Sequence, residues 1–141
     1  MNAYLNSYRN TQVQTASPEQ ILVMLYDGAI RFLNQACVAM ENGDRALKIK
    51  NLDKTLAIIA ELNATLNHEV GGEIAANLAA LYDFIMREIP RANAKNDPRV
   101  LQPVLNILGE LREAWVQAAE IVRKERAGQA PEQSAQVAAA Y

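Results

Sequence analysis

The chain has 141 residues, half of them hydrophobic, with a formal net charge of −2 and a single cysteine. This length fits one domain with a substantial core, and the acidic balance argues against nucleic acid or an anionic membrane surface as the main partner. One cysteine cannot form an internal disulfide, and neither a signal peptide nor an apolar run of membrane-spanning length is evident, so we expect a soluble protein of the cytosol.

The first 16 residues are polar apart from a short apolar strip formed by Tyr4, Leu5 and Tyr8. This strip has two interpretations. It is either a permanent lid over an apolar groove or a weakly held cap that a ligand displaces. A segment this short buries little area, so its docked state should be marginal.

The first long helix is predicted from Ser17 to about Met40. Ser17 and Gln20 have the spacing of a capping box, and Pro18 suits the first helical position. The apolar residues that follow cover about 200° of the helix circumference, about twice what one packed face needs. Either this helix lies at the centre of a bundle, or part of its face awaits a partner.

Three further helices are predicted. The second begins after Asp44 and reaches about His68, where Gly71 and Gly72 stop it; its expected core stripe is Ile49, Leu52, Leu56, Ile59 and Leu66. The third begins near Glu73, and Pro90 bends or ends it. The fourth follows Pro98 and ends near Arg126, with a kink or a separate first turn at Pro103.

These elements predict an all-α fold, an antiparallel up-down four-helix bundle with a short N-terminal cap segment. We expect a single domain over residues 1–126, in which residues 1–16 form the cap segment and residues 17–126 the four helices. Residues 127–141 lack a core pattern and are expected to form a flexible tail.

No catalytic, cofactor or metal site is indicated. A metal centre in a helical bundle needs Glu-x-x-His pairs on facing helices, and His68 is the chain's one histidine. We interpret His68 as a solvated residue at a helix end and Cys37 as a small core residue. The sequence therefore gives no support to an enzyme.

The remaining signals concern binding. Apolar residues outside the core stripes lie on three helices: Leu47, Ile58 and Leu62 on the second, Phe84 on the third, and Ile107, Ala114 and Ile121 on the fourth. One such strip is ordinary core periphery, but three together suggest grooves that take apolar side chains from another helix or an extended segment.

Blocks of sequence along the chain resemble the FliS family of bacterial flagellar secretion chaperones. They occur in the family's order at Gln12–Val13, Thr15–Gln20, Leu25–Ile30, Phe32–Leu33, Glu61–Leu62, Thr65–Leu66, Glu69–Ala75, Asn77–Leu78, Leu81–Asp83, Ala92–Asn93 and Glu110–Trp115. The departures are Phe84 where a tyrosine is usual, the prolines Pro90 and Pro103, and the low-complexity tail.

The resemblance implies a chaperone that binds the disordered C-terminal segment of flagellin, prevents premature polymerisation and delivers flagellin to a component of the flagellar type III export gate. It implies no cofactor, and a free chain that is a monomer or weak dimer. We expect the flagellin-binding groove to be lined by Ile58, Leu62, Ile74, Leu78, Phe84, Ile107 and Ile121, and the resemblance gives Tyr4, Leu5 and Tyr8 the role of a displaceable cap. The main alternative is a structural homodimeric bundle without a client.

Overall fold

The computed structural model describes residues 16–128. The expected cap residues Tyr4, Leu5 and Tyr8 and the expected flexible tail from residue 129 onward lie outside this range, so their roles stay predictions.

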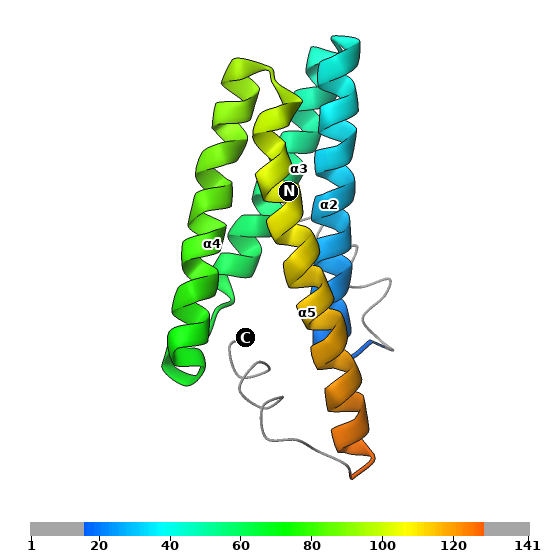
Figure 1. The fold of residues 1–141 in the computed structure, drawn as a ribbon, viewed down its shortest axis with the longest axis vertical. Helices are drawn as coiled ribbons and strands as arrows, with labels where there is room; N and C mark the ends of the chain where they lie inside the picture. Colours follow the sequence, from blue (N-terminus) through cyan, green and yellow to red (C-terminus); the bar gives the residue numbers. More distant parts are fainter. Residues whose placement is uncertain (1–15, 129–141) are drawn as a thin grey trace.

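Within the described range the fold is all-α, as the sequence predicts, and consists of four long helices and one 3-10 turn. They are α2 (Pro18–Asn42), α3 (Arg45–Ala64), α4 (His68–Lys95), η1 (Pro98–Leu101) and α5 (Gln102–Arg126). Successive helices run up, down, up and down along the long axis (Figure 1). α2 packs against both α3 and α5, α4 packs against α3, and η1 joins the upper ends of α4 and α5.

The predicted helix starts are confirmed where local polar groups decide them. The Ser17 hydroxyl accepts the Gln20 N–H at 3.2 Å, and the Gln20 side chain accepts the Ser17 N–H at 2.9 Å. Gly43 ends α2 with φ +71°, and the Asp44 side chain then accepts the Leu47 N–H at the start of α3. These interactions satisfy backbone groups that a helix end leaves without partners.

The predicted end of the second helix is wrong. α3 ends at Ala64, and Asn67 caps α4 by accepting the Val70 N–H at 3.0 Å, so His68 begins a helix. The glycine pair lies inside α4, where Gly72 has φ +51° and ψ −122° and kinks the helix. The glycine pair therefore interrupts helical geometry at the predicted place. The turn between the second and third helices, however, ends before the pair, because α4 already begins at His68.

Pro90 does not end its helix, because it lies inside α4, which continues to Lys95. Pro103 lies in the first turn of α5, and the separate turn η1 precedes it. Proline is tolerated in a first turn because its missing N–H has no intrahelical partner there.

The predicted core stripe of the second helix is largely confirmed, but the buried face is wider than the stripe. Leu52, Ile59 and Leu66 are buried and Leu56 packs against the core, whereas Ile49 is 38% exposed. The buried face of α3 also includes Asn51, Thr55, Ile58 and Leu62. The Thr55 hydroxyl donates to the Asn51 carbonyl and the Asn51 amide donates to the Leu47 carbonyl, both at 2.9 Å, so these buried polar groups are satisfied within the helix.

The central position of α2 explains its wide apolar arc. By length and composition α2 alone among the described helices passes as a candidate membrane span, which is weak support for one. In the fold 44% of its most apolar window is buried between the neighbouring helices. Of the two explanations that the sequence allowed, the central position in a bundle holds for α2.

Candidate functional site

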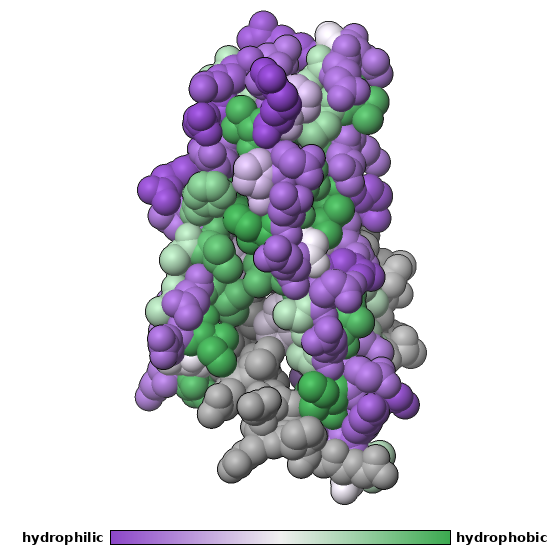
Figure 2. Space-filling view, in the orientation of Figure 1, coloured by the Kyte–Doolittle hydropathy of each residue, from purple (hydrophilic) through white to green (hydrophobic). Residues whose placement is uncertain are grey.

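Apolar side chains remain partly uncovered on a face of the structure formed by α4 and α5. α4 packs on α3 but has little contact with α5 below η1. In the orientation of Figure 2, hydrophobic side chains gather over α4 and between α4 and α5 in the lower half of the molecule. We call this region the α4–α5 face and define it by Ile74 and Phe84 on α4 and Ile107 and Ile121 on α5.

On α4, Ile74 and Phe84 are half-buried and pack against the margin of the core. Leu78, which the sequence also assigned to the groove, is only 8% exposed and belongs to the core cluster. The half-buried pair keeps apolar surface that no described element covers, because α5 stays apart from α4 at this level.

On α5, an ion pair shows which way the apolar strip of Ile107 and Ile121 faces. The Arg112 guanidinium donates to the Asp27 carboxylate of α2, so this flank of α5 faces α2. At 100° per residue, Ile107 lies about 140° and Ile121 about 180° around the helix from Arg112. The strip therefore lies away from α2, and both isoleucines are half-buried.

Ile58 and Leu62 do not join this face. Both are 1% exposed and belong to the core cluster. A Cβ added to Gly28 of α2 would lie 3.5 Å from the Ile58 Cδ1, which shows that Ile58 packs between α2 and α3. Any role of Ile58 or Leu62 in binding stays a prediction, but an aspartate at either position would put a charge into the core.

Charged residues near the α4–α5 face are paired within their own helices. Arg91 donates to Glu88 at 2.8 Å on α4, and Arg123 donates to Glu120 on α5. The Arg123 side chain lowers the pKa of the Glu120 carboxyl through this hydrogen bond. Because these charges already have partners within their own helices, a binding partner can bury the apolar side chains that lie between them.

The residues that could take part in metal binding or nucleophilic chemistry are scattered. The described residues contain no group of three or more His, Cys, Asp or Glu side chains that could hold a metal ion, and His68 is exposed at the first position of α4. Cys37 is half-buried against the core, and burial, with a smaller contribution from Glu41, raises the pKa of its thiol. A raised pKa keeps the thiol protonated and unreactive, as expected for a packing residue.

Comparison with known proteins gives a consistent family. The family model described as "Flagellar protein FliS" matches residues 1–122. This range includes α2, α3, α4 and α5 up to residue 122, and with them both sides of the α4–α5 face.

Individual relatives carry the same description. The chain is 40% identical over 122 residues to a flagellar secretion chaperone FliS of Bacillus subtilis, covering 86% of this chain and 90% of the relative. It is 43% identical over 117 residues to that of Vibrio cholerae, covering 83% and 86%. It is 40% identical over 118 residues to that of Salmonella typhimurium, covering 83% and 87%.

Proposed function

Because this chain belongs to the FliS family, we propose that it is a cytosolic export chaperone for flagellin. It binds the disordered C-terminal segment of flagellin, prevents premature polymerisation and delivers flagellin to the flagellar type III secretion apparatus. The family consists of flagellar secretion chaperones, which supports an export role and a flagellar protein as client.

The observation that carries the proposal is the α4–α5 face. A disordered client loses conformational entropy when it binds, so the chaperone must offer apolar surface that compensates this loss. Ile74, Phe84, Ile107 and Ile121 provide partly uncovered surface on two helices that have little contact with each other. A client helix or extended segment laid along this face would complete the layer that α4 and α5 leave open.

The test is calorimetric titration of the full chain with a peptide of the flagellin C-terminal segment. Ile107→Asp should weaken binding by about tenfold or more, because it places a charge where the client packs. Val38→Asp is the matched control: Val38 is an aliphatic residue on α2, 53% exposed and outside the α4–α5 face. Binding to flagellin that lacks this segment should be absent.

Two results would contradict the proposal. One is undiminished affinity of the Ile107→Asp variant with its circular dichroism spectrum unchanged. The other is equal binding of flagellin with and without its C-terminal segment.

We further propose that Tyr4, Leu5 and Tyr8 act as a displaceable cap over part of the client site. Deleting residues 1–16 should leave a cooperatively folding bundle, because Ser17 and Gln20 form the capping box of α2 with each other. Loss of an internal competitor should raise the apparent affinity for the flagellin peptide. A truncated chain that no longer melts cooperatively would make the segment a structural part of the fold.

A further inference from the structure

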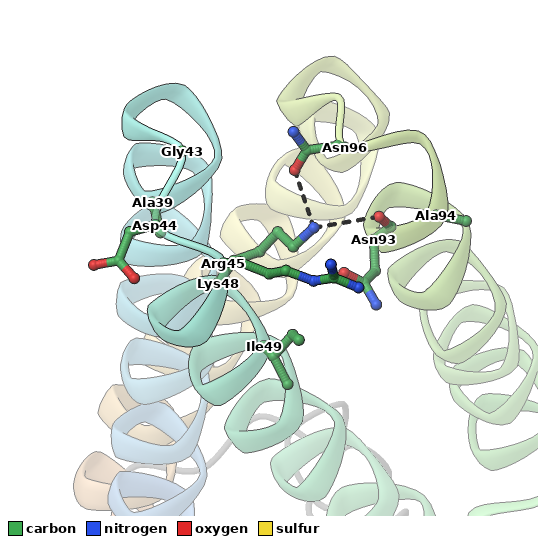
Figure 3. A pocket seen from close by; sticks show the side chains of 9 residues that line it. All are labelled: Ala39, Gly43, Asp44, Arg45, Lys48, Ile49, Asn93, Ala94 and Asn96. Atoms are coloured by element: carbon green, nitrogen blue, oxygen red, sulfur yellow. Dashed lines mark hydrogen bonds between the residues drawn. The ribbon is translucent and has the colours of Figure 1, made fainter.

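A polar cleft lies at the opposite end of the bundle from residues 16 and 128, where the turn between α2 and α3 meets the C-terminus of α4 (Figures 1 and 3). Its volume is about 430 Å³, and its lining includes Arg45, Lys48, Ile49, Asn93 and Asn96. The two strongly charged side chains aimed into it are both cations (Figure 3).

Lys48 is a buried cation whose side-chain hydrogen-bond partners in the described chain are neutral. It is 7% exposed, and its Nζ donates to the Asn96 Oδ1 at 3.0 Å and to the Asn93 carbonyl at 3.5 Å. These bonds place a positive charge at the C-terminus of α4, where the helix dipole favours it. An ammonium group has three N–H donors, so the cap leaves one available toward the cleft.

Arg45 supplies the second cation. The side-chain bonds that cap the C-terminus of α4 come from Lys48, so capping does not explain the position of Arg45. Its exposed side chain extends across the same opening (Figure 3), and it forms no ion pair with any residue from 16 to 128. Six other arginines in this range are paired with carboxylates: Arg87, Arg91, Arg99, Arg112, Arg123 and Arg126. Asp44 also lines the cleft, but its carboxylate lies on the side of the turn away from Arg45 and Lys48 (Figure 3) and accepts the Leu47 N–H.

We propose that this cleft binds an acidic side chain of a partner protein. A carboxylate that enters it can take two parallel N–H bonds from the Arg45 guanidinium and a further one from Lys48. The occupant is a protein segment because the opening also carries an aliphatic side chain, Ile49, which is 38% exposed. Arginine beside exposed aliphatic surface is typical of protein–protein interfaces.

The cleft is distinct from the proposed client site, because none of the four residues that define the α4–α5 face lines it. Ile74 and Ile121 lie in the halves of α4 and α5 that are far from the α2–α3 turn, whereas Ile107 lies in the half of α5 that begins at η1 (Figure 1).

The test is an NMR titration of the full chain with an acetylated tetraglutamate peptide. Backbone shifts should change at Arg45, Lys48, Asn93 and Asn96 and should be absent with tetraglutamine. Succinate is a third ligand, because equal or tighter binding of this free dicarboxylate would overturn the docking of a protein segment. Absence of shifts at these four residues with tetraglutamate would overturn the proposal altogether.

A pair of variants separates a specific cleft from general charge attraction. Arg45→Glu should weaken the peptide's apparent affinity by about tenfold with an unchanged melting temperature, because Arg45 is exposed. Lys50→Glu makes the same change in net charge on the same helix, at an exposed residue that does not line the cleft, and should retain binding. An equal loss of peptide affinity in Arg45→Glu and Lys50→Glu would overturn the assignment of peptide binding to the cleft.

Discussion

The two sides of this bundle are built differently. On one side α2 lies between α3 and α5, and its core residues Tyr26, Ala29, Leu33 and Ala36 are fully buried. On the other side α4 rests on α3, and Ile74 and Phe84 on its flank stay half-buried. The contrast teaches that α2 is enclosed by its neighbours, while the α4–α5 face leaves apolar surface partly uncovered, which is where we propose that the client binds.

The largest expected effect comes from truncating matched isoleucines on the two sides. Ile58→Ala should lower the free energy of unfolding by about 3 kcal/mol, because it leaves a cavity between α2 and α3. Ile107→Ala should cost about 1 kcal/mol, because Ile107 is only half-buried. Urea denaturation measures both values, and equal losses would remove the distinction between the two sides.

The next effect concerns the link between α2 and α4. The hydroxyls of Tyr26 and Tyr82 are hydrogen-bonded to each other across the core, and both side chains are fully buried. Tyr26→Phe should cost about 2 kcal/mol, because it leaves the Tyr82 hydroxyl buried without this partner. In a double-mutant cycle with Tyr82→Phe, the two losses should sum to more than the loss in the double variant. Strictly additive losses would show that the hydroxyls do not couple α2 to α4.

A smaller effect is expected at the kink of α4. Gly72→Ala should cost about 1–2 kcal/mol, because a side chain at φ +51° is strained even though no atom lies within 4 Å of the added Cβ. Thermal melting with circular dichroism checks the loss. A stabilised variant would mean that α4 can straighten through the glycine pair without cost.

The smallest effect is expected at the Asp27–Arg112 ion pair. Its side chains are 42% and 34% exposed, so solvent screens the interaction. Arg112→Met should cost less than about 1 kcal/mol, and added salt should reduce the difference from the original chain. A large, salt-independent loss would show that Arg112 acts mainly through packing against α2.

Local chemistry made much of the fold predictable from the sequence. The capping box at Ser17, the turn at Gly43 and Asp44 and the separate turn before Pro103 each depend on neighbouring residues, and all are confirmed. The full width of the buried face of α3 could not be predicted in this way. Asn51 and Thr55 are buried because α2 and α4 pack on two sides of α3 and because each polar group finds a carbonyl within its own helix.

The candidate sites, too, could be predicted from the sequence only in part. The half-buried state of Phe84, Ile107 and Ile121 agrees with their place in strips outside the tight core, and Ile74 is half-buried as well; the role of all four in binding stays a prediction. Ile58 and Leu62 lie in the core because the buried face of α3 is wider than its predicted stripe. The cationic cleft gave no sequence signal, because Lys48 and Asn93 are 45 positions apart and meet only in the folded chain.

The most direct test of the α4–α5 face is the isoleucine δ1-methyl NMR spectrum of the full chain, recorded with and without the flagellin C-terminal peptide. The account predicts large shifts for the methyl groups of Ile74, Ile107 and Ile121 and small shifts for the buried Ile58 and Ile59. Shifts confined to methyl groups elsewhere, such as that of Ile49 on α3, would contradict the assignment of the client to the α4–α5 face.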